Sequence, residues 1–211
     1  MERTAKLIEA RHIMGKNFIG PDELSLISDQ MGIIIPNSYP DITFTLRELE
    51  EKKNDYLLIL GVSQILGGGK LTLKSLRDYF GINSNINEPC FYNQDWYLNE
   101  VFINKSLKTQ WYLVKKTLYE NSRGMNPSDL KSKYFLPSAI LCAFSFFCYW
   151  FHTGGDILWP YDFIWCEDFD HNGDQIYVGK YNDVLGVNKS GFSIHRHLTL
   201  REFYGCIDAY K

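Results

Sequence analysis

The chain has 211 residues, of which 45% are hydrophobic and 22% charged, a composition typical of a globular protein long enough to bury a core. Its formal net charge is -3 at pH 7, so no overall electrostatic attraction to nucleic acid or acidic membranes is expected. The cysteines show no closely paired spacing, and the start of the chain lacks the apolar stretch of a signal peptide. We therefore expect reduced, mostly buried thiols in a soluble cytoplasmic protein.

Helical patterns dominate the first part of the chain. Apolar spacing and terminal signals predict four helices, over residues 4–14, 21–31, 46–54 and 73–80. Thr45 and Glu48 have capping-box spacing at the start of the third helix. The compact apolar run 56–62 is typical of a buried strand.

A glycine-rich turn with a lysine lies between this strand and the fourth helix, in the order found in phosphate-binding loops. Such a loop needs a glycine five residues before its Gly-Lys pair and a Ser or Thr directly after it. Here Gln64 and Leu71 occupy those two places, so the sequence favours a flexible connection.

A polar, turn-rich segment around residues 83–89 separates an N-terminal helical portion, 1–85, from an aromatic-rich portion, 86–211. Alternation and β-favouring residues predict strands over 90–97, 109–115, 159–166, 175–181 and 191–198. Asn172 and Gly173 form a strong hairpin signal between two of these strands. Thr199 and Glu202 have capping-box spacing, which predicts a closing helix.

The most apolar stretch, residues 134–156, predicts a buried helix over 137–152. Pro137 suits the first helical turn, and Gly154 suits its end. A membrane span is the alternative, but the run is shorter than the roughly 20 apolar residues that spanning requires. We therefore expect an α+β fold in which an antiparallel sheet packs around a central apolar helix, with both portions in one cooperative unit.

Four stretches, residues 13–18, 91–97, 137–139 and 168–179, carry a resemblance that covers nearly the whole chain. Across them the chain resembles a group of uncharacterised bacterial proteins. The resemblance implies a single coherent fold. It implies no catalytic residue, because the group has no assigned activity.

The sharpest local motif alternates oxygen-bearing side chains before a glycine turn: Asp168, Asp170, Asn172 and Asp174. Such alternation is typical of calcium loops, in which several oxygens converge on a hard cation. However, Gly179 stands where the bidentate acid of such a loop belongs. A metal-free hairpin turn, in which Asp and Asn bond their own backbone, is therefore the favoured interpretation.

His195 and His197 fall on one face of a predicted strand, a spacing that can chelate zinc if carboxylates join them. With Asp168 and Asp170 they would form a metal-dependent hydrolase or nuclease, in which the metal lowers the pKa of a bound water. This requires all four side chains to converge in a cleft. Solvent-facing or hydrogen-bonded histidines are the alternative.

An aromatic cluster supports the leading hypothesis, that the protein binds another protein. Calcium or zinc in the hairpin is an open alternative to the metal-free turn. Tyr92, Trp96, Trp111 and Tyr112 are residue types that binding surfaces favour, although a half-buried sheet accounts for them equally well. Nucleic-acid binding would need a basic patch, for which the candidates are Lys105, Lys108, Lys115 and Lys116. It ranks below the other hypotheses because the chain is acidic overall.

Overall fold

The computed structural model describes residues 5–181, 191–196 and 200–211, and for residue 181 only the backbone. In this part of the chain it has an α+β fold, which confirms the predicted class. The helices are α1 Leu7–Met14, α2 Pro21–Met31, α3 Leu46–Lys52, α4 Leu73–Phe80, α5 Pro127–Leu130 and α6 Ala139–Thr153. The strands are β1 Phe18–Ile19, β2 Tyr56–Leu60, β3 Trp111–Lys115, β4 Phe163–Phe169, β5 Gln175–Tyr181, β6 Gly191–Arg196, β7 Tyr204–Gly205 and β8 Ala209–Tyr210. Three short 3-10 turns are η1 Gly15–Asn17, η2 Val101–Asn104 and η3 Glu120–Ser122.

The strands form two mixed sheets, whereas the sequence analysis expected one antiparallel sheet. The first has the order β1-β2-β3-β8 and the second β6-β5-β4-β7. Each contains one parallel pair, β1 with β2 and β4 with β7, and its other pairs are antiparallel. The first sheet pairs β1 and β2, which precede residue 85, with β3 and β8, which follow it. The two predicted portions of the chain therefore share one sheet.

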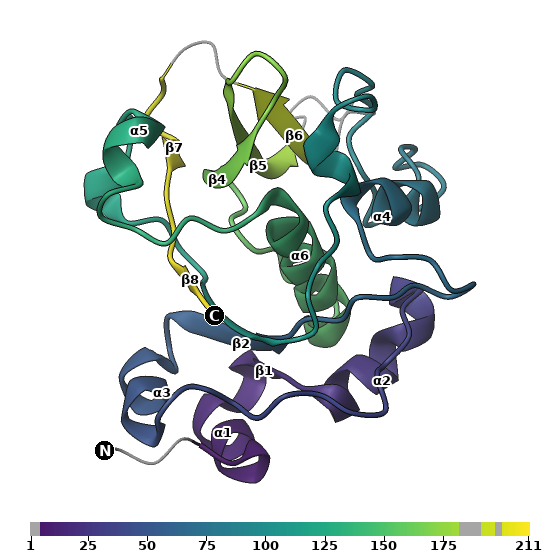
Figure 1. Ribbon diagram of the computed structural model, residues 1–211, viewed down its shortest axis with the longest axis vertical. Helices are drawn as coiled ribbons and strands as arrows, with labels where there is room; N and C mark the ends of the chain where they lie inside the picture. The colour runs from purple at the N-terminus through teal and green to yellow at the C-terminus, as the bar shows by residue number, and fades with distance from the viewer. Residues whose placement is uncertain (1–4, 182–190, 197–199) are drawn as a thin grey trace.

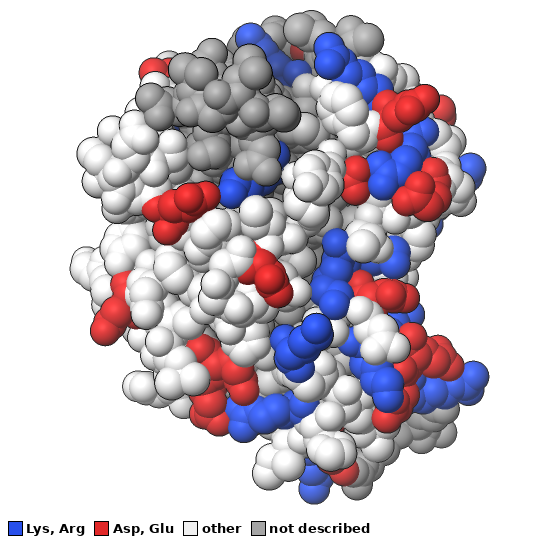
Figure 2. Space-filling model, turned by 180° about the vertical axis from the view of Figure 1, so that it is seen from behind, with Lys and Arg blue, Asp and Glu red and all other residues white. Residues whose placement is uncertain are grey.

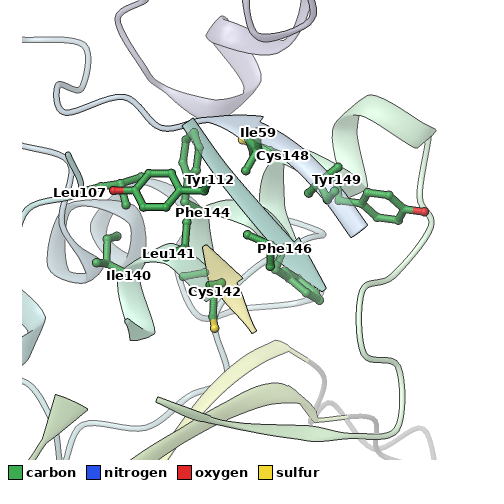
Figure 3. Close-up of a cluster of buried hydrophobic side chains, with 14 of the residues drawn as sticks. Ile59, Leu107, Tyr112, Ile140, Leu141, Cys142, Phe144, Phe146, Cys148 and Tyr149 are labelled. Carbon is green, nitrogen blue, oxygen red and sulfur yellow. The ribbon is translucent and has the colours of Figure 1, made fainter. Parts of the chain in front are cut away.

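Helix α6 lies between the two sheets, and α1 and α3 lie on the far side of the first sheet (Figure 1). Every residue of α6 from Ala139 to Tyr149 is buried, because an apolar helix must be covered on most sides. The side chains of α6 lie in one buried cluster with residues of the first sheet, such as Ile59 of β2 and Tyr112 of β3 (Figure 3). Within the described residues, no helix is long and apolar enough to cross a membrane.

The ends of α6 follow ordinary capping chemistry. The Ser138 hydroxyl accepts a hydrogen bond from the N–H of Leu141, so Pro137 precedes the cap and does not lie in the first turn as predicted. At the other end Gly154 has φ 76°, a left-handed conformation that glycine adopts without steric cost. The helix therefore ends where the sequence predicted.

Aromatic rings fill the space beside α6. Phe147 stacks on Phe80 of α4 with ring centroids 4.1 Å apart and lies 5.1 Å from Phe91. Burying each such side chain contributes about 1.5–3 kcal/mol to folding. All five cysteines are free and buried, as the sequence analysis expected. Much of the high aromatic content is thus structural.

Most predicted elements are confirmed, including α2, α4 and the β4–β5 hairpin. Two strand predictions need correction. Residues 90–97 form mostly irregular backbone that ends in a turn, with one isolated bridge from Phe91 to Phe192. The strand predicted from residue 159 begins only at Phe163, because Trp159 has φ 51°, which extended backbone does not allow.

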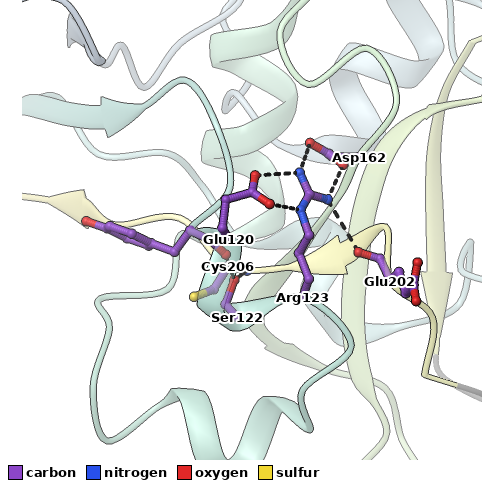
Figure 4. Close-up of polar contacts among 7 residues, drawn as sticks. Glu120, Ser122, Arg123, Asp162, Glu202 and Cys206 are labelled. Carbon is purple, nitrogen blue, oxygen red and sulfur yellow. Dashed lines mark hydrogen bonds and ion pairs between the residues drawn. The ribbon is translucent and has the colours of Figure 1, made fainter.

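The predicted closing helix is also wrong. Its first residue, Thr199, lies outside the described residues, and the segment after it forms β7 and β8. Arg123 holds this segment: its guanidinium donates to Asp162 at 2.7 and 3.2 Å, to Glu120, and to the carbonyl oxygen of Glu202 (Figure 4). Tertiary contacts of this kind override a local capping signal.

Candidate functional site

The predicted calcium loop folds as a hairpin turn whose main carboxylate is already occupied. Asp170 is buried, and its Oδ1 accepts the N–H groups of Asn172 at 2.9 Å and Asp174 at 2.8 Å. Its Oδ2 lies 3.0 Å from a guanidinium nitrogen of Arg196. Burial alone would raise the pKa of Asp170, but these N–H groups and Arg196 hold it below its ordinary value.

Asp168 serves the core helix and not the loop. Its carboxylate accepts the Ala139 N–H, at the start of α6, at 2.7 Å, and pairs with Lys105 at 2.5 Å. The side chain is 2% exposed. A carboxylate at a helix N-terminus is favoured by the helix dipole. Two of the four predicted calcium ligands are therefore committed to protein donors.

The structure adds Glu100, which the sequence analysis missed because it lies about 70 residues before the hairpin. Ligand atoms of Glu100, Asp170 and His171 lie within 4.8 Å of one another. However, the Glu100 carboxylate already accepts the His171 backbone N–H at 2.9 Å, and its other oxygen lies 2.6 Å from His171 Nδ1. A cation here would have to displace these bonds, so the cluster fits a pinned turn better than a metal site.

His195 lies apart from these acids. Arg196 reaches Asp170, and neighbouring strand residues point to opposite faces, so His195 points away from that carboxylate. Its ring stacks on Tyr177 with centroids 5.2 Å apart, and burial lowers its pKa to about 4. His197 lies outside the described residues. Among the described residues, the convergence required for the hydrolase hypothesis is not formed.

The four predicted binding aromatics do not form one surface. Trp111 and Tyr112 are 2% and 3% exposed in β3, so they belong to the core. The indole N–H of Trp111 donates to the carbonyl of Pro40 at 2.9 Å. Tyr92 and Trp96 are half-buried, and the Trp96 indole N–H donates to Ile194 at 3.0 Å. A partner of the folded chain would meet neither ring of β3.

Three of the four lysines considered for a basic patch have separate structural partners. Besides the Lys105 pair, Lys116 donates to the side-chain oxygen of Asn17 at 2.8 Å, and the Lys115 ammonium lies 5.2 Å from the ring centroid of Tyr56. On the face shown in Figure 2, acidic and basic side chains are interleaved. These observations do not favour a nucleic-acid surface.

A groove with a volume of about 880 Å³ lies between α3, the segment after α5, and β8. We call it the α3–α5 groove. The two helices lie on the same side of the molecule (Figure 1), and the outline is hollowed between them, at the right in Figure 2. It is lined by Thr43, Phe44, Glu48, Lys52, Leu113, Lys131, Tyr134, Phe135, Leu136, Glu167, Ala209, Tyr210 and Lys211.

One buried carboxylate fixes the wall of this groove. Asp208 accepts the N–H of Phe135 at 2.7 Å, the hydroxyl of Tyr119 at 2.7 Å and the hydroxyl of Tyr210 at 2.8 Å. Burial and the bond to Asp208 raise the pKa of Tyr210, which therefore stays protonated and neutral at physiological pH. The backbone of Phe135 is fixed by its bond to Asp208, whereas the residue is 65% exposed.

The acidic and basic side chains of the groove differ in the partners that they have within the protein. Glu48 accepts the N–H and hydroxyl of Thr45, and the N–H of Thr45 lowers its pKa. Glu167 lies 3.8 Å from the Lys211 ammonium. The ammonium of Lys52 instead lies 5.4 Å from the ring centroids of Tyr56 and Tyr210. The remaining groove cation is the Lys131 ammonium, 3.7 Å from the Phe169 centroid.

Neither Lys52 nor Lys131 forms an ion pair within 4.0 Å among the described residues, although Lys52 lies near enough to Glu48 to contribute to its lowered pKa. A cation over an aromatic face keeps much of its capacity to bind an anion. The sequence analysis missed this site, because its residues come from five separate segments of the chain. The arrangement can hold a negatively charged group beside an exposed apolar side chain.

Comparisons with protein families, with curated proteins and with solved structures found no match to this chain.

Proposed function

We propose that this chain binds another protein, and that the α3–α5 groove takes a short acidic segment of the partner that also carries an apolar side chain. The observation that carries the proposal is that the glutamates of the groove have internal partners, whereas two of its lysines form no ion pair among the described residues. Glu48 accepts hydrogen bonds from Thr45 and Glu167 forms an ion pair with Lys211, whereas Lys52 and Lys131 lie over aromatic rings. Carboxylates of the partner would form ion pairs with both lysines.

The apolar part of the proposal rests on Phe135 and the groove volume. A large aromatic side chain that is 65% exposed, on a backbone fixed by Asp208, is a typical interface anchor. A volume of about 880 Å³ accommodates a few side chains of a partner segment. Attraction at the rim and burial at Phe135 together favour a segment in which acidic and apolar residues alternate.

The test is a selection from a displayed library of random peptides of about 16 residues, long enough to span roughly 50 Å when extended. We expect the selected peptides to be rich in Asp and Glu next to Phe, Leu or Trp. Lys52→Glu should weaken their binding about tenfold at low salt, because it replaces attraction with repulsion. Phe135→Ser should weaken it by a similar factor.

Lys133→Glu is the matched control, since Lys133 is exposed on the same segment but does not line the groove. It should leave peptide affinity nearly unchanged. Peptides without acidic enrichment, or peptides whose binding is equally insensitive to Lys52→Glu and Phe135→Ser, would overturn the proposal. Binding of small anions alone, with no peptide selected, would point to a small-molecule site instead.

A further inference from the structure

A second hollow, of about 440 Å³, lies on the other side of α5, beside the β4–β5 hairpin. We call it the hairpin hollow. Its walls include the side chains of Pro127, Trp165, Phe169, Gln175 and Leu200, one cation, Lys131, and one carboxylate, Asp174. Lys131 also lines the α3–α5 groove, so the two hollows share one cationic side chain.

The shared lysine joins the two hollows physically. The Lys131 ammonium lies 3.7 Å from the ring centroid of Phe169, which lines the hairpin hollow. Phe135, four residues after Lys131 in the chain, lines the groove. An anionic group bound at Lys131 would therefore lie between two apolar surfaces. The described residues leave both surfaces open: Phe135 of the groove is 65% exposed, and Phe169 and Leu200 of the hairpin hollow are 44% and 42% exposed.

We propose that the partner segment is longer than the α3–α5 groove and continues over Lys131 into the hairpin hollow. It would place one apolar side chain beside Phe135, an acidic side chain at Lys131, and a second apolar side chain between Phe169 and Leu200. This inference rests on the proposed function of the groove and adds the length and residue pattern of the bound segment. Charge complementarity at Lys131 is the reason that the occupant is an acidic peptide.

The experiment uses the peptides selected on the unaltered chain and measures their affinity by fluorescence anisotropy. Selected sequences should contain two apolar positions with Asp or Glu between them. Phe169→Ser should weaken binding about tenfold, and so should trimming the peptide at the end that enters the hairpin hollow. Tyr161→Ser is the control, because Tyr161 is 81% exposed and lines neither hollow.

The outcomes separate this inference from the proposed function. If Phe135→Ser and Lys52→Glu weaken binding but Phe169→Ser and Leu200→Ser do not, the segment stops in the groove and the inference is wrong. If none of the four substitutions weakens binding, the proposed function fails as well. Each variant is first checked for an unchanged circular dichroism spectrum and unfolding midpoint, and Phe169→Leu replaces Phe169→Ser if the latter fails to fold.

Discussion

In the hairpin loop, residues 168–174, the carboxylate of Asp170 accepts two backbone N–H groups and pairs with Arg196. In the α3–α5 groove, by contrast, the ammonium of Lys52 lies over aromatic rings with no carboxylate within 4.0 Å among the described residues. The hairpin has the denser charge, but the carboxylates of Asp168 and Asp170 have internal partners. The comparison teaches that density of charge alone does not mark a site, because closely spaced charged groups can be bound by the protein itself.

The comparison predicts first that the hairpin aspartates are structural. Asp168→Ala should lower the free energy of unfolding by about 3 kcal/mol, because the buried N–H of Ala139 loses its acceptor and Lys105 its partner. Urea denaturation measures this loss. Asp174→Ala is the matched control and should change stability by no more than about 0.5 kcal/mol, since no described group bonds its carboxylate. Equal losses for the two variants would contradict this account.

Asp170→Asn should lower the free energy of unfolding at pH 7 by about 2 kcal/mol, because charge-assisted hydrogen bonds are lost. The pKa of Asp170 is lowered in the folded chain, so its ionised form stabilises the fold above the unfolded pKa. This contribution disappears as the pH falls through the lowered pKa. The difference between the unaltered chain and the variant should therefore narrow below about pH 4.

The same Asp170 variant tests the role of calcium. Because the Asp170 oxygens already have donors, added Ca²⁺ should leave the unfolding midpoints of both proteins unchanged. A calcium-dependent rise of several degrees in the unaltered chain, abolished by Asp170→Asn, would reverse the comparison and make the hairpin the functional site.

His195 should behave as a buried neutral histidine and not as a metal ligand. Its folded pKa is lowered from 6.5 to about 4, so only the unfolded chain gains a proton between these values. Stability should therefore fall as the pH is lowered from 6.5 toward 4, by about 1.6 kcal/mol between pH 6.5 and pH 5. His195→Phe should flatten this dependence, and NMR titration of the imidazole should show that only a small fraction is protonated at pH 5. A midpoint near 6.5 would contradict the burial seen here.

The smallest effect is expected for the groove lysines. Lys52→Ala and Lys131→Ala should each change the free energy of unfolding by no more than about 0.5 kcal/mol, because exposed cation–π contacts contribute little. Thermal unfolding measures this directly. A loss as large as that of Asp168→Ala would mean that these lysines stabilise the fold, and would weaken the case for the groove.

Much of the secondary structure could be predicted from the sequence because its signals are local. The ends of α2 and α4 are marked by Pro21, Gly32, Thr72 and Gly81, and the hairpin turn by Gly173, which has φ 84°. The failures have tertiary causes. The aromatic residues 90–97 resemble a strand, but Phe91 and Trp96 pack against β6 and the core without forming a ladder.

The sequence by itself determined the class of fold, the apolar helix α6 and the hairpin, because capping, turn chemistry and apolar periodicity act over a few neighbouring residues. Tertiary structure alone decided which charged groups are paired. Asp168 meets Lys105 across 63 residues, whereas Lys52, Phe135 and Tyr210 meet in one groove from three separate segments. Contacts between distant segments leave no spacing rule in the chain, so the groove became visible only in the folded protein.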